Sequence, residues 1–126
     1  MPHTTITDMH TVGIGVSDQE AAVDFYVDSL GFEKRLDAQV SPDMRWIEVA
    51  PTEASTSIAL NQVEKPGGVI TDTGIRYVVP DVEAEHATMQ ERGVDVGEVL
   101  RWEGVPPMYT FDDPDGNRFY VVEETR

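Results

Sequence analysis

The feature that most constrains the fold is an internal repeat. One stretch starts at Thr11 and reads TVGIGVSDQEAAVDFYVDSLGFE, and a second starts at Ile75 and reads IRYVVPDVEAEHATMQERGVDV. In each, an apolar run ends in Val-x-Asp, a helix-like stretch follows, and a Gly with an apolar neighbour closes the unit. Further apolar strands are expected at 45–49 and 57–60 in the first half, and at 108–111 and 118–122 in the second. The sequence therefore predicts a β-α-β-β-β unit built twice.

Local signals place the two helices. Ser17 and Glu20 have the spacing of a capping box, in which each side chain accepts a hydrogen bond from the other residue's backbone N–H. Asp81 is the expected N-cap of the second helix. Gly31 and Gly93 stand where a left-handed residue would end each helix.

Glycine and proline indicate a linker between the two halves and a tight turn near the end of the chain. The segment 62–69 contains Pro66, Gly67 and Gly68 and is predicted to be a linker. We therefore expect one domain over 9–126, with module one at about 9–62, the linker at about 63–72 and module two at about 73–124. The sequence Asp-Pro-Asp-Gly at 113–116 has the residues of a tight turn between two strands.

The charge balance narrows the possible partners. The chain has 24 Asp and Glu against 9 Lys and Arg, for a net charge of −15. Nucleic acid is not an expected partner, because phosphate backbones are bound by clustered Lys and Arg. The acidic surface is either simply solvated or favours a cationic ligand. There is no cysteine, no run of about 20 apolar residues and no signal-like start. We therefore expect a cytoplasmic protein without membrane contact.

Several short motifs recur in a familiar order. They are Val-Ser-Asp at 16–18, Asp-Phe-Tyr at 24–26, Leu-Gly-Phe at 30–32, Val-Pro-Asp at 79–81 and Phe-Asp-Asp-Pro-Asp-Gly-Asn at 111–117. Together they resemble the vicinal oxygen chelate superfamily, which contains glyoxalase I, bleomycin-resistance proteins, fosfomycin-resistance enzymes and extradiol dioxygenases. The resemblance implies an α+β fold in which paired βαβββ modules form an open, cup-like β-barrel. It also implies a homodimer.

The resemblance can be tested at the metal site. The superfamily's enzymes hold a divalent metal with His, Glu or Gln from the first and last strands of each module. Those positions fall on Thr11, Ala59, Ile75 and Tyr120 here. Alanine and isoleucine offer no donor, so no metal cofactor is expected. A one-residue shift of register would bring His10 into the first position, which leaves a divalent metal as the alternative.

Strand alternation predicts the contents of the cup. If position 11 faces the cup, the following side chains line it: Thr11, Trp46, Glu48, Ala59, Asn61, Ile75, Tyr77, Met108, Thr110, Arg118 and Tyr120. Apolar and aromatic walls with few polar groups are typical of a small-molecule pocket. A single bulge would invert the facing of any one strand.

Glu48 is the most informative of these residues. A carboxylate in an apolar cup would have a raised pKa unless it were paired. It could act as a catalytic general base or as an anchor for a cationic ligand. Equally, it could form an ion pair with Arg118 or Arg45 that only satisfies both partners.

Three functions remain open at this stage. The first is binding or sequestration of a small molecule in an aromatic cup, as in bleomycin-resistance proteins. The second is a glyoxalase-like lyase or isomerase, or a dioxygenase. It would use either a metal held by His10 and Glu48 or, without metal, Glu48 as base with Arg118 or Tyr120 holding the substrate oxygen. The third is a structural or regulatory protein whose own side chains fill the cup.

Overall fold

The computed structural model describes residues 3–65 and 67–125. Its first half forms one module, in which a strand, a helix and three strands follow one another. The elements are β1 (Thr11–Val16), α1 (Gln19–Val23), η1 (Asp24–Ser29), β2 (Glu33–Ser41), β3 (Met44–Ala50) and β4 (Ser57–Gln62). The helix continues from α1 into η1, where its turns widen to π-helical geometry. The strands form one sheet in the order β1-β4-β3-β2.

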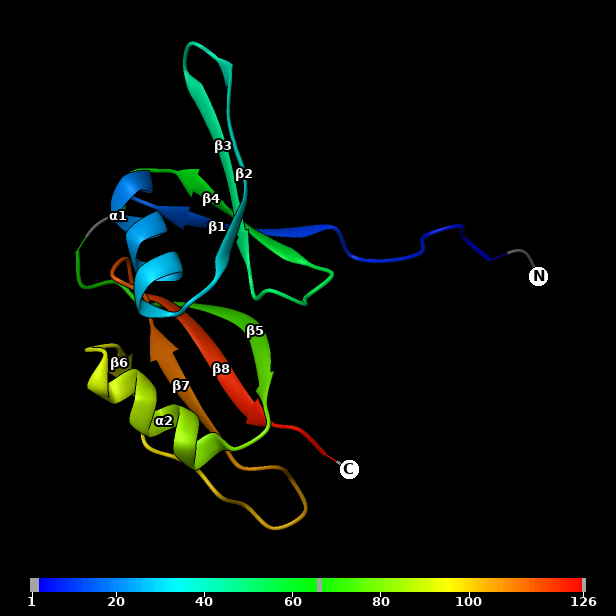
Figure 1. The fold of residues 1–126 in the computed structure, drawn as a ribbon, viewed down its shortest axis with the longest axis vertical. Coiled ribbons are helices and arrows are strands. Elements are labelled where there is room, and N and C mark those ends of the chain that lie inside the picture. Colours follow the sequence, from blue (N-terminus) through cyan, green and yellow to red (C-terminus); the bar gives the residue numbers. More distant parts are fainter. Residues whose placement is uncertain (1–2, 66, 126) are drawn as a thin grey trace.

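The second half repeats this arrangement. Its elements are β5 (Thr71–Val79), α2 (Val82–Glu91), β6 (Asp95–Val96), β7 (Met108–Asp112) and β8 (Asn117–Glu123). They form a second sheet in the corresponding order, β5-β8-β7-β6. The predicted pair of βαβββ modules is therefore confirmed, with each module built on its own four-stranded sheet (Figure 1). The linker lies between β4 and β5, and Pro66 within it falls outside the described residues.

One apolar core serves both modules. It joins Ile14, Tyr26 and Leu60 of the first half to Phe111 and Phe119 of the second. The Tyr26 and Phe119 rings meet edge to face at 6.2 Å between centroids, across the boundary between the modules. Each sheet thus turns one face toward this core, and we call the opposite face its outer face.

A polar cluster reinforces the same boundary. Asp113, in the predicted turn, is buried and accepts hydrogen bonds from the Tyr26 hydroxyl at 2.7 Å and from Asn117 Nδ2 at 2.9 Å. Asn117 Nδ2 also donates to the Gly15 carbonyl. The Asp-Pro-Asp-Gly segment does connect β7 to β8, and it also fastens module two to module one.

The predicted helix caps are partly wrong. Asp18, not Ser17, caps α1 and accepts from the Ala21 backbone N–H. Ser17 instead donates its hydroxyl to Asp115, and Glu20 pairs with Arg45. Serine and aspartate can both cap a helix, and Ser17 is hydrogen-bonded to the distant Asp115 instead.

The other helix predictions hold. Asp81 caps α2 by accepting from the backbone N–H of Ala84. Gly31 and Gly93, just beyond the two helical segments, both have a φ of +79°. No helix among the described residues is both long and apolar enough to cross a bilayer.

Two segments extend away from the body of the molecule. Figure 1 shows the β2–β3 hairpin projecting at one end and the chain before β1 running outward. Both expose apolar side chains, with Val40 59% and Ile6 81% exposed. The sites described below lie nearer the sheets.

Candidate functional site

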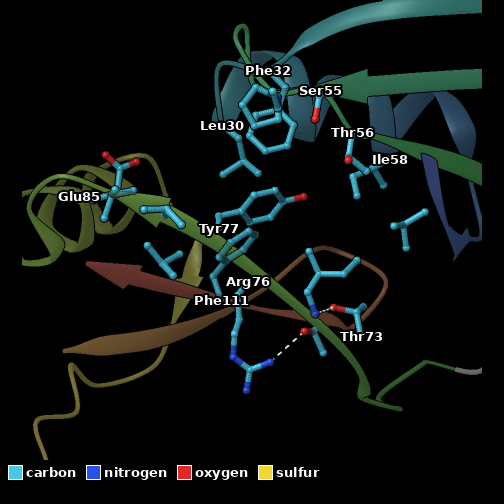
Figure 2. Close-up of a pocket in the computed structure, with 18 of the residues that line it drawn as sticks. Leu30, Phe32, Ser55, Thr56, Ile58, Thr73, Arg76, Tyr77, Glu85 and Phe111 are labelled. Carbon is cyan, nitrogen blue, oxygen red and sulfur yellow. Dashed lines mark hydrogen bonds between the residues drawn. The ribbon is translucent and has the colours of Figure 1, made fainter. Parts of the chain in front are cut away.

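A large groove lies where the two modules meet. Its volume is about 900 Å³. Side chains from both halves line it, and the apolar ones include Leu30, Phe32, Ile58, Tyr77, Met89 and Phe111. Figure 2 shows Ser55, Thr56, Thr73 and Glu85 around this apolar lining. A predominantly apolar concavity of this size, with few polar groups, is suited to a small organic molecule.

Tyr77 supplies the distinctive polar atom of the groove. Its ring packs against Phe32, Phe111 and Phe119 at centroid distances of 5.5, 6.2 and 5.6 Å. Its hydroxyl is buried and has no hydrogen-bond partner among the described residues. Figure 2 shows the hydroxyl directed toward the side where Thr56 and Ile58 lie. Burial raises the pKa of Tyr77, so the group stays protonated and can donate a hydrogen bond.

The outer face of module one carries a buried carboxylate. Glu48 Oε1 accepts from the Ser57 hydroxyl at 2.6 Å, and Oε2 accepts from Trp46 Nε1 at 2.7 Å. These hydrogen bonds, from Ser57 first and then Trp46, lower the pKa of Glu48 below its ordinary value. The prediction of a raised pKa is therefore wrong, because two donors stabilise the ionised form. A carboxylate with a lowered pKa is a weak general base at neutral pH.

The suggested ion pairs of Glu48 are also wrong. Arg118 pairs with Asp112, and Arg45 pairs with Asp37 and Glu20. The basic side chain beside Glu48 is instead that of His10, whose Nε2 is 3.8 Å from Oε2.

The outer face of module two is more evenly charged. Arg118 donates to Asp112 through Nε and Nη2, at 2.8 and 3.0 Å. Tyr120 donates its hydroxyl to Asp72 at 2.6 Å. The Arg76 guanidinium lies over the Tyr120 ring, 4.5 Å from its centroid. Arg118, Asp112, Asp72 and Arg76 thus each have a partner nearby.

Most residues predicted for the cup lie on the outer faces, in two groups. Strand pairing places Thr11, Trp46, Glu48, Ala59 and Asn61 on the outer face of module one. It places Met108, Thr110, Arg118 and Tyr120 on that of module two.

Ile75 and Tyr77 do not share a face with Tyr120, so their predicted facing is wrong. The pairing of β5 with β8 shifts between Asp72 and Arg76, and Arg76, not Ile75, is opposite Tyr120. The irregularity leaves the alternation intact, because Asp72 and Arg76 still share a face. The predicted facing fails because matching Val79 to Val16 puts Gly74, not Ile75, at the position of Thr11. Ile75 and Tyr77 consequently line the groove between the modules.

Comparison with known proteins agrees with this architecture. Residues 8–121 match the model of the Glyoxalase/Bleomycin resistance protein/Dioxygenase superfamily. The chain belongs to this superfamily.

Three similar proteins span nearly the whole chain. A superfamily member of solved structure from Sphaerobacter thermophilus is 41% identical, with a TM-score of 0.87, covering 96% of this chain and 100% of that one. TnmS3, an antibiotic binding protein from Streptomyces sp. CB03234, is 35% identical with a TM-score of 0.84, covering 98% and 100%. The uncharacterized protein YetH of Bacillus subtilis is 29% identical over 94% of this chain and 99% of its own length.

The superfamily's metal does not fit the residues found here. Ala59 and Ile75 stand at two of the expected ligand positions and carry no donor atom. Tyr120 donates to Asp72, and the Thr11 hydroxyl donates to the Ser57 carbonyl. Within 3–65 and 67–125, no three His, Asp or Glu side chains gather as a metal site would require.

The sequence did not reveal the groove residues from module one. Leu30 and Phe32 flank Gly31 at the end of the helix and were noted only as a motif. Met89, on α2, belongs to the core and also borders the groove. Apolar residues that line a groove and those that fill a core look alike in a sequence.

Proposed function

We propose that this protein binds a small, largely apolar molecule reversibly in the groove between its modules and thereby sequesters it. The observation that carries this proposal is the groove of about 900 Å³ with the unpartnered Tyr77 hydroxyl in its apolar wall. A buried donor without a partner is costly, and a ligand with a carbonyl-type acceptor would relieve that cost.

The charge of the chain restricts the ligand further. A net charge of −15 repels anions over several ångströms of solvent. The expected ligand is therefore neutral or cationic. The similarity to TnmS3, which is described as an antibiotic binding protein, supports a binding role of the same general kind.

The test uses Nile red, a neutral dye with a carbonyl group whose emission rises in apolar surroundings. We expect saturable binding to the intact chain. Ser55 lies on the loop before β4 and lines the groove, so Ser55→Trp should weaken dye binding by about tenfold or more through steric blockage. Thr52 is exposed on the same loop and does not line the groove, so Thr52→Trp should leave binding unchanged.

Tyr77→Phe adds a chemical test. It removes the hydroxyl while keeping the ring that packs against Phe32 and Phe111. We expect dye affinity to fall about threefold to tenfold, the contribution of one neutral hydrogen bond. If Ser55→Trp binds the dye as tightly as the unaltered protein, the groove is not the binding site and the proposal fails.

A further inference from the structure

A second feature of the molecule points to a different ligand chemistry. We propose that Glu48 and Trp46, on the outer face of module one, form a binding site for a protonated amine. None of the residues that hold Glu48 in place lines the groove between the modules. The proposal therefore stands independently of the function assigned to that groove.

The Glu48 carboxylate is buried and fixed in position. Its side chain is 9% exposed. The Ser57 hydroxyl, on the neighbouring strand β4, donates to Oε1. The Trp46 indole N–H, on β3 like Glu48 itself, donates to Oε2. Both donors are neutral, so they orient the carboxylate without cancelling its charge.

No lysine or arginine in the described parts of the chain forms an ion pair with Glu48. Arg35, whose charge acts on Glu48 from a distance, is hydrogen-bonded to Glu33 and to the carbonyls of Pro51 and Ala54. Hydrogen bonds from neutral groups thus keep Glu48 ionised but leave its charge unneutralised. The outer face of module two contrasts with this, since its arginines lie against acidic or aromatic partners.

A protonated amine would supply the missing charge. Attraction between opposite charges is stronger near the protein than in bulk water, and the overall negative charge raises the local concentration of cations. The Trp46 indole N–H donates to the carboxylate, so the edge of the ring lies beside the charge and its emission should respond to a ligand bound there.

The approach to the carboxylate is from the side of His10. Its imidazole lies beside Oε2 and is 84% exposed, so the carboxylate is just beneath the surface there. One carboxylate and one imidazole are too few donors for a closed divalent metal site. The carboxylate instead suits an amine, which needs only one charged acceptor.

The test uses Trp46 itself as reporter. Trp102 is 55% exposed, and the Trp102→Phe background leaves Trp46 as the remaining tryptophan. The probe is 2-phenylethylamine at pH 7.5, and the neutral control is 2-phenylethanol. We expect a saturable change in Trp46 emission with the amine and none with the alcohol.

Three variants separate charge from packing. Glu48→Gln should weaken amine binding by about tenfold or more, because it removes the charge. Ser57→Ala removes one of the two donors that orient the carboxylate but keeps the charge, and should weaken amine binding less than Glu48→Gln does. Glu53→Gln, in the exposed β3–β4 loop, removes one charge elsewhere in module one and should also bind normally.

Several results would overturn the proposal. They are equal amine binding by Glu48→Gln, equal responses to the amine and the alcohol, or no response to the amine. A response to zinc chloride without one to the amine would instead identify a metal site at His10 and Glu48. Nile red binding by Glu48→Gln is measured in parallel, so that failure of this site is distinguished from failure of the groove.

Discussion

The two modules share their topology but differ in how their outer faces handle charge. In module two, Arg118 and Asp112 pair directly, and Tyr120 lies between Asp72 and Arg76. In module one, Glu48 is held by neutral donors alone. The two modules therefore share the apolar pattern of their core-facing side chains, whereas the side chains of their outer faces differ in chemistry.

The backbones of the two first strands differ as well. β1 pairs with β4 without interruption from Thr11 to Val16. β5 has an irregular pairing with β8, and Gly74 within it has a φ of +71°. Both strands nevertheless turn corresponding side chains toward the groove, Val12 from β1 and Ile75 from β5.

The largest expected effect is at the junction of the modules. Asp113→Ala leaves the buried Tyr26 hydroxyl and Asn117 amide without their acceptor, and should lower the free energy of unfolding by about 3 kcal/mol or more. Urea titration measures this. Asp115→Ala, on the same turn, removes only the more exposed contact with Ser17 and should cost less than half as much. Equal losses would mean that the buried cluster does not join the modules.

Replacing one glycine in each half should give the next largest loss of stability. A Cβ at Gly116 would lie 2.3 Å from the Val69 carbonyl oxygen, whereas a Cβ at Gly31 would meet nothing within 4 Å. Both residues have positive φ, at +77° and +79°. Gly31→Ala should cost about 1 kcal/mol for the backbone conformation alone, and Gly116→Ala about 3 kcal/mol. Thermal unfolding compares them, and the reverse order would contradict the close approach at Gly116.

Much of the fold could be predicted from sequence because its signals are local or repeated. The stop signals at Gly31 and Gly93 depend on backbone conformation within a few residues. The cap at Ser17 could not be decided, because its competing partner, Asp115, is 98 positions away along the chain. Local chemistry therefore fixes where a helix starts only to within a residue.

The candidate site was harder to predict than the fold. Alternation correctly grouped Trp46 with Glu48 because β3 is regular there. It failed for Tyr77 because the two halves were matched one residue out of step, with Ile75 in place of Gly74 opposite Thr11 of the repeat. The pKa direction of Glu48 depends on Ser57, which belongs to the neighbouring strand and is brought close only by pairing.

The Glu48 carboxylate of module one should make the stability of the fold depend on pH. Hydrogen bonds from Ser57 and Trp46 lower the pKa of Glu48 below its ordinary value of 4.5. The resulting stabilisation is present above that value and is lost as the pH falls through the lower pKa of the folded state. The free energy of unfolding of the unaltered protein should therefore exceed that of Glu48→Gln by about 1.5 kcal/mol at pH 7. This difference in stability should become smaller below pH ~4. A gap that stays constant down to pH 3 would contradict this account.

Of the interactions compared, the Arg118–Asp112 ion pair of module two should contribute least to the free energy of unfolding. Arg118 is 38% exposed, so its two hydrogen bonds to Asp112 are partly screened by solvent. Arg118→Gln should lower the free energy of unfolding by about 0.5 kcal/mol, and 1 M NaCl should remove most of that difference. Urea titrations at low and high salt measure both effects. Glu48, being buried, should respond much less to salt, since its neutral partners carry no charge to screen. If Arg118→Gln costs more than Glu48→Gln, the exposed pairs of module two matter more than the buried carboxylate, and the contrast between the modules no longer holds.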